Sequence, residues 1–573
     1  MNTDAGLIAA WDLRGDARDG SGNGHHGHPG GGVDFGVPGP LPGPQPGGAA
    51  GFDGRGAQVT VPDAPGLRLG AGDFSIVARV RVPQRLDDGL GDLCAKFDPG
   101  ARRGFALGLL HLTGVTSHQP NSRQVYFGVD AGSEPVWEDA GRPGNAVLVK
   151  SLAVHAGDLY AGTYEAGAGE SGRVYRYAGG TRWEDCGAPD RCNAVTALAV
   201  HAGDLYAGVS RYKAGGSSLP ESPNPAPGGR VYRYAGGVSW EDGGPLDPGH
   251  VLARAGAGAE AGSPYRSPVC DSVAALAVYG DALYAIPMYS EGLFRHAGGT
   301  RWVSCGTPGY RLMALGVFDG ALYAAGNQSA GVLRYDGGEG AAARWTGCGR
   351  PAGVSQVYSF AVYGGRLHAG TWPEGRVFRY DGGETWTDCG RLGEEQEVMG
   401  MAAYNGKLYA GTLPLAEVYR YDPEGAAAGG SGGSPWTRVG RLDRTPDVRY
   451  RRVWSMAQYG GRLFAGTLPS GRVAALRAGA GVTTAEALAP GWRHVVAVRQ
   501  GGRLSLYVDG REAAAGGAAA APALDVSTAA PLRLGAGPHD FLYGSLAGVR
   551  LYGRALDAAE VAGLAARGQS AGD

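Results

Sequence analysis

Long apolar runs, paired metal-binding cysteines and an excess of charge of one sign are all missing from this sequence. No apolar stretch is long enough to cross a bilayer, and no charged start with an apolar core precedes Leu7. We therefore expect no membrane span, and either a cytoplasmic protein or the mature form of an exported one. The 52 basic and 54 acidic side chains nearly balance, and no basic stripe interleaved with aromatics indicates a nucleic-acid partner.

Cysteine is scarce, with seven residues in 573. Cys186, Cys305, Cys348 and Cys389 hold the same place in different copies of a repeat. Equivalent places in separate repeats lie too far apart to bridge, so we expect small buried thiols. A bridge between Cys186 and Cys192 is the alternative. No CxxC or His-rich spacing indicates zinc.

Catalytic motifs are missing too. The sequence shows no GxSxG, phosphate-binding loop, paired-carboxylate signature or Cys-His arrangement. We name no catalytic residue, and our interpretation leans toward a non-enzymatic protein. Nothing in the sequence indicates an oligomeric state.

Glycine is abundant, with 105 residues, and it falls at fixed places in a repeat, as in the turns of an all-β protein. The repeat contains a short strand that begins with tryptophan. Its copies begin at Trp137, Trp183, Trp240, Trp302, Trp345, Trp386 and Trp436. The first copy closes no unit before it, and the last unit, which ends near Arg472, has no such strand after it. This pattern predicts a ring of four-stranded units whose two ends share one unit.

Each unit also contains an apolar strand that would line the centre of the ring. These strands are predicted to begin near Leu148, Val195, Val273, Leu312, Val357, Val398 and Val453. Their number predicts a seven-bladed β-propeller.

The two ends of the chain share a different style, with short alternating strands broken by glycine. Examples are residues 74–81 and 492–498. A short helical pattern over residues 557–566 follows the last strand, with Asp557 as its cap and Glu560 three places on. We expect one sandwich formed from both ends, with the propeller inserted in a loop of the sandwich.

Several motifs in these ends resemble the laminin-G-like, concanavalin A-like jelly-roll family. They are Trp11-Asp12-Leu13, residues 19–24, Phe52-Asp53-Gly54, Tyr507-Val508-Asp509-Gly510 and residues 550–556 with Glu560. The middle of the chain resembles kelch-like or tectonin-like propellers. The expected fold is an all-β concanavalin A-like jelly-roll sandwich interrupted by a seven-bladed β-propeller. The predicted boundaries are 1–133 and 480–573 for the jelly roll and 134–479 for the propeller.

Loops of variable length should gather on one face of the propeller, where binding residues are usually found. Aromatic rings beside arginine and asparagine suit a polar ligand with apolar faces. Blade packing is the competing interpretation of each residue. The candidate ligand-binding residues are Tyr164, Arg211, Tyr289, Tyr310, Asn327, Trp372 and Arg452.

The laminin-G-like resemblance also implies calcium, which many members hold through acidic loops. Oxygen ligands could then come from Asp12, Asp19, Asn23 and Asp53. Our leading hypothesis is a non-enzymatic recognition protein that binds a carbohydrate or protein ligand through the propeller loops, the jelly roll or both. Two alternatives stay open: a glycan-active hydrolase or lyase, and a structural component of a larger assembly.

Overall fold

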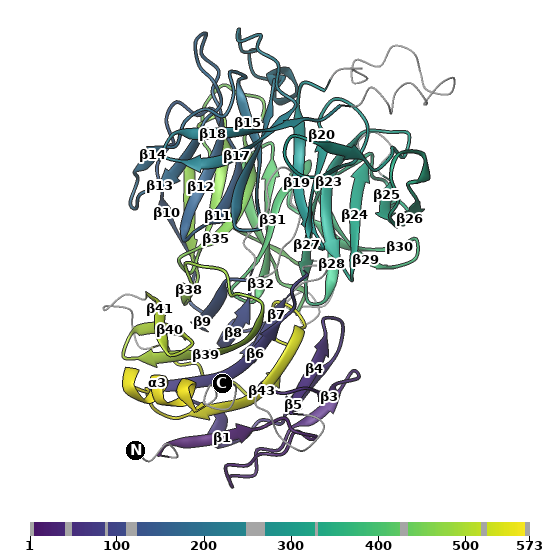
Figure 1. The fold of residues 1–573 in the computed structure, drawn as a ribbon. Helices are drawn as coiled ribbons and strands as arrows, with labels where there is room; N and C mark the ends of the chain where they lie inside the picture. Colours follow the sequence, from purple (N-terminus) through teal and green to yellow (C-terminus); the bar gives the residue numbers. More distant parts are fainter. Residues whose placement is uncertain are drawn as a thin grey trace.

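The protein has two parts, a sandwich and a propeller (Figure 1). The computed structural model describes residues 5–40, 48–85, 90–110, 123–247, 270–326, 331–424, 434–516 and 524–567. Both ends of the chain build the sandwich and the middle builds the propeller, so the predicted fold is confirmed. Within the described ranges, no helix has the length and apolar character needed to span a membrane.

The sandwich consists of two antiparallel sheets. The first has the order β3 (Asp34–Val37), β4 (Ala49–Asp53), β43 (Tyr543–Tyr552), β6 (Phe74–Val82), β39 (Gly491–Gln500), β40 (Arg503–Val508) and β41 (Arg511–Gly516), and β1 (Leu7–Trp11) also pairs with β43. The second has the order β2 (His28–Gly30), β5 (Gln58–Val61), β42 (Leu532–Leu534), β7 (Gly91–Asp98), β8 (Arg103–Leu109), β9 (Val125–Ala131) and β38 (Ala480–Thr483). Because β6 lies between β39 and β43, neither end of the chain completes the first sheet alone.

Side-chain alternation gives the first sheet an inner and an outer face. Phe74, Ile76 and Ala78 of β6 point into the core between the sheets, whereas Val77 points outward. Helix α3 (Ala558–Ala566) covers part of the outer face, where Val561 and Leu564 pack against it. The predicted cap is present, since the Asp557 carboxylate accepts from the Glu560 amide and the Glu560 carboxylate accepts from the Asp557 amide. A short 3-10 turn, η1 (Pro65–Leu67), follows β5.

Seven four-stranded blades form the propeller. In chain order the inner strands are β11 (Leu148–His155), β15 (Ala194–His201), β19 (Val273–Tyr279), β23 (Leu312–Phe318), β27 (Gln356–Tyr363), β31 (Glu397–Tyr404) and β35 (Arg452–Tyr459). The second strands are β12 (Asp158–Tyr164), β16 (Asp204–Ser210), β20 (Ala282–Pro287), β24 (Ala321–Gly326), β28 (Arg366–Trp372), β32 (Lys407–Leu413) and β36 (Arg462–Leu468). Each inner strand begins within one residue of its predicted start.

The outer half of each blade completes the pattern. The third strands are β13 (Val174–Tyr177), β17 (Arg230–Gly236), β21 (Phe294–His296), β25 (Val332–Tyr335), β29 (Arg376–Gly382), β33 (Glu417–Tyr421) and β37 (Val473–Arg477). The outermost strands are β10 (Val136–Asp139), β14 (Trp183–Asp185), β18 (Ser239–Pro245), β22 (Trp302–Ser304), β26 (Trp345–Gly347), β30 (Thr385–Arg391) and β34 (Trp436–Arg441). The short turns η2 (Ala214–Ser217) and η3 (Gly340–Ala342) lie in the loops.

The ring closes as the unmatched first strand predicts. Strand β10 pairs antiparallel with β37, so that Trp137 lies opposite Leu476 and Asp139 lies opposite Ala474. An ion pair of 3.1 Å between Arg472 and Asp139 lies beside this seam. The last blade therefore has the order β10-β37-β36-β35 and contains residues from before and after all the other blades.

Each outermost strand carries one tryptophan that contacts the preceding blade. Nε1 of Trp183 donates to the Ala140 carbonyl at 2.8 Å, and Nε1 of Trp386 donates to the Cys348 carbonyl at 2.8 Å. The same bond recurs at Trp137, Trp240, Trp302 and Trp436. Among the described residues Trp345 differs, because its buried Nε1 has no hydrogen-bond acceptor.

Cysteines of the propeller lie at these inter-blade contacts. Cys348 packs in one hydrophobic cluster with Trp386, and Cys389 packs in one cluster with Trp436. All seven cysteines are buried and free, so the small-thiol interpretation is confirmed and no Cys186–Cys192 bridge forms. Burial raises the pKa of these thiols, which keeps them protonated and unreactive near neutral pH.

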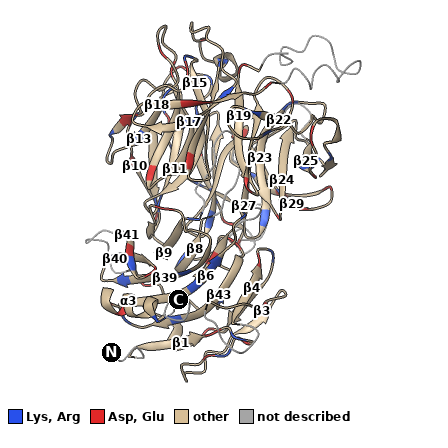
Figure 2. Ribbon diagram, viewed as in Figure 1, with Lys and Arg blue, Asp and Glu red and all other residues tan. Residues whose placement is uncertain are grey.

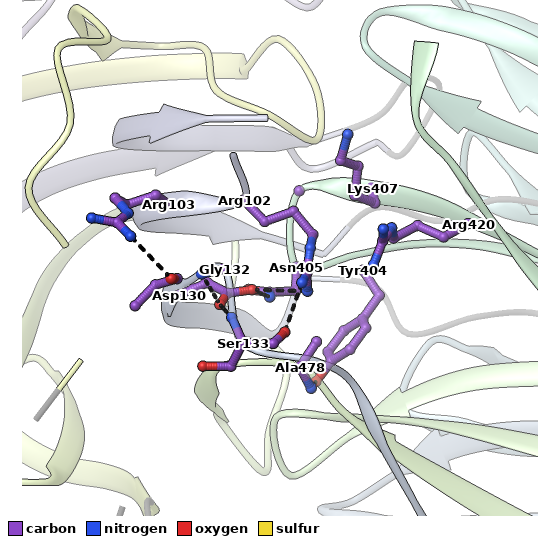
Figure 3. A network of polar contacts seen from close by, with 12 residues as sticks. Arg102, Arg103, Asp130, Gly132, Ser133, Tyr404, Asn405, Lys407, Arg420 and Ala478 are labelled. Atoms are coloured by element: carbon purple, nitrogen blue, oxygen red, sulfur yellow. Dashed lines mark hydrogen bonds and ion pairs between the residues drawn. The ribbon is translucent and has the colours of Figure 1, made fainter. Parts of the chain in front are cut away.

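The turn between β31 and β32 joins the propeller to the sandwich (Figure 3). Asn405 Nδ2 donates to Asp130 Oδ2 at 2.6 Å, and the Tyr126 hydroxyl donates to Asn405 Oδ1. Asp130 is fully buried, accepts from two backbone amides and forms an ion pair with Arg102 at 3.5 Å. Burial raises the pKa of Asp130, and the charge of Arg102 opposes this shift.

A second contact extends this junction. The Gly406 amide donates to His539 Nε2 at 2.8 Å, and Asp92 holds the other side of the same ring. Gly406 has a positive φ, and a Cβ there would lie 2.5 Å from the Phe97 ring, so only glycine fits. The tight turns between inner and second strands thus face the sandwich, and the opposite face of the propeller points away from it (Figure 1).

Exchanging Trp386 for phenylalanine should destabilise the protein more than the same exchange at Trp345. Trp386→Phe leaves the Cys348 carbonyl without its donor, at a cost of about 1–2 kcal/mol. Trp345→Phe removes an N–H group that has no acceptor. Thermal and urea denaturation of both variants measures the difference. Equal losses would show that the indole bond contributes nothing beyond ring packing.

The junction predicts a pH-dependent effect for Asn405→Asp. At neutral pH two carboxylates would face each other in a buried site, which we expect to cost about 3 kcal/mol. Burial raises the folded-state pKa of Asp130, so folding favours the protonated carboxyl. The protonated carboxyl therefore stabilises the folded state at low pH, and this stabilisation is lost as the pH rises through the folded-state pKa. Stability should therefore recover as the pH falls toward about 4.

The matched control is Asn405→Gly, which accommodates the φ of 44° at this position and adds no carboxylate. Thermal denaturation between about pH 4 and 8 compares the two variants. A pH dependence of the same size in Asn405→Gly would contradict a direct interaction with Asp130.

Candidate functional site

The candidate site is the end of the propeller channel that faces away from the sandwich. We call it the mouth and define it by one residue of each inner strand, which lies one or two places after the start predicted by the repeat. All seven inner strands have a register shift of the bulge type at this point, which leaves one residue outside the pairing with the second strand, or two in β31. Bulges of this kind redirect side chains and are frequent beside functional sites. The seven residues are Lys150, Thr196, Ala274, Met313, Tyr358, Met399 and Trp454.

A buried lysine lies at the mouth. Lys150 Nζ is 4.1 Å from the ring centre of Tyr212 and 4.1 Å from that of Trp454. The side chain has no exposed surface, and burial lowers its pKa well below the usual value. The positive charge of Arg452 lowers the pKa further, whereas Glu397 raises it.

Arg452 and Glu397 form the charged pair beside this lysine. Arg452 Nε lies 3.7 Å from Glu397 Oε1, and the guanidinium also lies 5.2 Å from the Trp454 ring centre. Burial raises the pKa of Glu397, while Arg452, a hydrogen bond from Tyr358, and Lys150 hold it down. The negative charge of Glu397 counteracts the effect of burial on Arg452 and keeps the guanidinium charged.

The loop after β16 covers one side of the mouth. Arg452 Nη1 donates to Ser217 Oγ at 2.9 Å, and Ser217 Oγ shares a 2.5 Å hydrogen bond with the Tyr212 hydroxyl. Turn η2 of the second blade therefore rests on Arg452 of the last blade. The other side differs, because Tyr310, Arg311 and Tyr358 keep part of their surface exposed.

Four of the predicted ligand residues converge here. Tyr164 packs against Tyr212 with ring centres 5.1 Å apart, and burial raises the pKa of Tyr164 to about 12. Tyr289 accepts from the Lys213 amide through its hydroxyl and lies beneath the Lys213 ammonium at 4.5 Å. Tyr310 packs against the hydrophobic cluster that contains Tyr164, Tyr289 and Trp454, and Arg452 stacks on that tryptophan.

The other predicted ligand residues lie further out. Arg211 is exposed at the start of the loop that carries η2. Trp372 ends β28 and is half-buried beside Gln356, its partner across the strands. Asn327 lies outside the described residues.

Sequence reasoning missed Lys150, Glu397, Tyr358 and Trp454 as members of the site. One signal was present, since Lys150 interrupts an apolar strand at a place where each of the other blades carries an uncharged residue. The bulge that turns this place toward the mouth has no sequence signature of its own, so strand alternation alone gave no reason to select it.

The predicted calcium ligands do not form a cation site in this structure. Asp19 accepts from the amides of Ala10, Ser21 and His25, and Asp53 accepts from three consecutive amides beginning at Arg55. Both carboxylates thus fix loops, and these bonds hold the pKa of each below its usual value against burial. No group of three or more His, Cys, Asp or Glu side chains in the described ranges could hold a metal. The residues therefore do not fit the calcium that the resemblance implies.

Comparison with known proteins supports the fold. The concanavalin A-like lectin/glucanases superfamily, in its third laminin-G form, matches residues 436–562. This match covers the C-terminal part of the sandwich and begins inside the last blades of the propeller. The chain is similar to that superfamily over this segment. No curated protein matches the sequence.

Three solved structures align with about three fifths of the chain. The extracellular domain of the putative one component system BT4673 from B. thetaiotaomicron has 13% identity and a TM-score of 0.39 over 59% of this chain and 39% of that one. An inactive variant of virginiamycin B lyase from Staphylococcus aureus, with quinupristin, has 10% identity and a TM-score of 0.40 over 60% and 99%. The WD40 beta propeller domain of Doa1 has 11% identity and a TM-score of 0.39 over 60% and 97%.

The chain spans less than half the length of the first of these proteins. The sheets described above and the superfamily match define an all-β protein with a concanavalin A-like sandwich and a propeller. Folds of these two kinds indicate a ligand-binding role in general.

The charged pair at the mouth predicts unequal effects of two substitutions. Glu397→Gln leaves the buried Arg452 without an opposite charge and should cost about 3 kcal/mol. Lys150→Met keeps a long chain between Tyr212 and Trp454 and removes a buried amine, so stability should stay the same or rise. Chemical denaturation measures both. A larger loss for Lys150→Met would contradict the assignment of Glu397 and Arg452 as the dominant pair.

Proposed function

We propose that this is a non-enzymatic recognition protein whose propeller mouth binds a carbohydrate or protein ligand. The observation that carries the proposal is the partly exposed group of Tyr310, Arg311 and Tyr358 beside the buried charged cluster. Aromatic faces suit the apolar side of a sugar or peptide, and a guanidinium suits its oxygen atoms.

The surroundings support this interpretation because they fix the side chains in advance. Arg311 lies 6.0 Å from the Tyr289 ring centre, and Tyr289 is held by the Lys213 amide. Tyr358 is held by Glu397, which pairs with Arg452. Binding groups that are already ordered lose little conformational freedom when a ligand arrives.

We also propose the division 1–133, 134–479 and 480–573 for the two parts. Strand β9 ends at Ala131 and β10 begins at Val136, while β37 ends at Arg477 and β38 begins at Ala480. Both connections are therefore short. Each proposed boundary lies between the last strand of one part and the first strand of the other.

A glycan-active hydrolase or lyase is the second candidate, favoured by one observation. Tyr358 donates a hydrogen bond to Glu397 beside Arg452, and a tyrosine next to a carboxylate can move protons. Against it, Glu397 and Arg452 have only 2% and 6% of their surface exposed. Hydrolysis of chromogenic glycosides or cleavage of uronate polymers that is lost in Glu397→Gln would establish the enzyme.

A structural role in a larger assembly has less support. Among the described residues, Val136 and Val238 are the exposed large hydrophobics, and they lie on separate outer strands and turns. A broad apolar patch of the kind that subunit interfaces use is therefore not visible in those ranges.

Trp372→Ala and Tyr310→Ala should each weaken binding by about tenfold or more, because Trp372 lies further out on the same propeller face as Tyr310 and each variant removes a ring that can stack on a ligand covering both. Trp372→Phe and Tyr310→Phe are the matched controls, since they keep an aromatic face. A glycan array and a peptide array, read with all four variants, measure the effect. Retained binding in both alanine variants, or binding to neither array, would exclude the mouth as a carbohydrate or peptide site.

A further inference from the structure

The outer face of the first sandwich sheet carries a cavity that the functional proposal does not use. Its volume is about 350 Å³, and it lies beside the C-terminal end of helix α3. The lining includes charged or polar side chains from five segments of the chain. They are Asp12, Arg14, Arg79, His494, Arg550 and Arg567.

Strand register explains why these side chains meet. On β6, Arg79 points outward beside Val77, and its partners across the neighbouring strands are His494 and Ala547. Arg550 lies opposite Val77 on β43, where a register shift between Ala547 and Arg550 bends the strand. Helix α3 packs on the apolar part of this face, and the cationic side chains lie beside its C-terminal end.

Among the described residues that line the cavity, arginines outnumber carboxylates. No ion pair joins Arg14, Arg79 or Arg550 to an acidic side chain within the described ranges, although the Asp12 carboxylate lines the same cavity. Burial lowers the pKa of Arg79, the positive charges of Arg550 and Arg14 lower it further, and the negative charge of Asp509 opposes these effects. Like charges gathered in a half-buried hollow are unfavourable unless an anion offsets them.

Arg79 has a structural task that uses only a small part of its bonding capacity. Its Nη2 donates to the Leu564 carbonyl at 3.0 Å, in the last turn of α3. A guanidinium has five N–H donors, so the remaining donors are available for a ligand. Helix capping therefore accounts for the place of Arg79 and not for the presence of Arg550 and Arg14.

His494 gives a second, independent indication. It is 6% exposed and lines the cavity, and its buried Nδ1 has no hydrogen-bond partner. Buried polar atoms in proteins are usually satisfied, so such an atom beside a cavity indicates a missing partner. A ligand with both donor and acceptor oxygens would supply one.

We propose that this cavity binds an oxyanion, a phosphate, sulfate or carboxylate group, through the guanidiniums of Arg79, Arg550 and Arg14. Planar guanidiniums bind such groups through paired hydrogen bonds, and three of them match an anion with three oxygens. Asp12 accepts hydrogen bonds only, so it favours a ligand that also carries a hydroxyl group. This inference is independent of the function proposed for the propeller mouth.

Isothermal titration of the full chain with inorganic phosphate, sulfate, acetate and glucuronate, at constant ionic strength, tests the proposal. We expect at least one of them to bind at a single site. Preference for phosphate or sulfate identifies an ester-type group, and preference for glucuronate over acetate identifies an acidic sugar. No binding by any of the four would overturn the proposal.

Arg550→Gln should weaken this binding by about ten- to a hundredfold, because one charge-assisted contact is lost. Arg81→Gln is the matched control, since Arg81 lies two residues beyond Arg79 on the same face of β6 but lines a different cavity. Should Arg550→Gln not fold, the exposed Arg14→Gln replaces it. An unchanged dissociation constant in the folded cavity variant, or an equal loss in Arg81→Gln, would refute the site.

Discussion

The pairing of β10 with β37 is the constraint on which the rest of the structure depends. It brings Val136 opposite Arg477, so the chain enters and leaves the propeller at one place. The sandwich strands that flank this pair are arranged in the same way. Strand β9, which precedes β10, pairs with β38, which follows β37, and Ala480 lies opposite Val129. The two ladders follow one another along the same pair of chain segments. An insertion joined in this way adds no strain to its host, since the host strands would be neighbours without it.

Because the ring is closed, every blade packs against two neighbouring blades. Each inner strand packs beside the next, and the tryptophan of each outermost strand reaches back to a carbonyl of the preceding blade, with Trp345 as the one deviation among the described residues. Neighbouring blades therefore contact each other at the outer edge of the propeller as well as at its centre. The carbonyl that accepts from the indole belongs to Ala140, Gly243 or Val439 in three blades and to a cysteine in three others, so this position needs no thiol chemistry. The mixture of acidic and basic residues over the ribbon in Figure 2 fits a surface without one dominant charge.

Much of this fold could be predicted from the sequence because the propeller consists of sequence repeats. The unmatched copy at Trp137 gave the closure, the apolar strands gave seven blades, and Asp557 with Glu560 gave the cap of α3. The candidate site was harder to predict from the sequence. Lys150 is placed by a bulge and Glu397 by a buried ion pair, and neither feature has a local sequence signature. The cover formed by η2 depends on a contact between Ser217 and Arg452, which lie far apart in sequence. Long-range side-chain contacts of this kind cannot be inferred from periodicity.

Strand β31 connects the two regions that matter most for function. Its first residue, Glu397, belongs to the mouth, and its last residue, Tyr404, precedes the Asn405 turn that is bound to Asp130. A strand of this length spans about 25 Å. Because the sandwich end of β31 is fixed by buried hydrogen bonds, the carboxylate at the other end is fixed in position relative to Arg452. The inserted propeller thus uses its host as an anchor for the strand that carries the acid of the mouth. Coupling of the mouth to the sandwich would need a second arrangement of this strand. Asn405, held between Asp130 and Tyr126, opposes any such rearrangement.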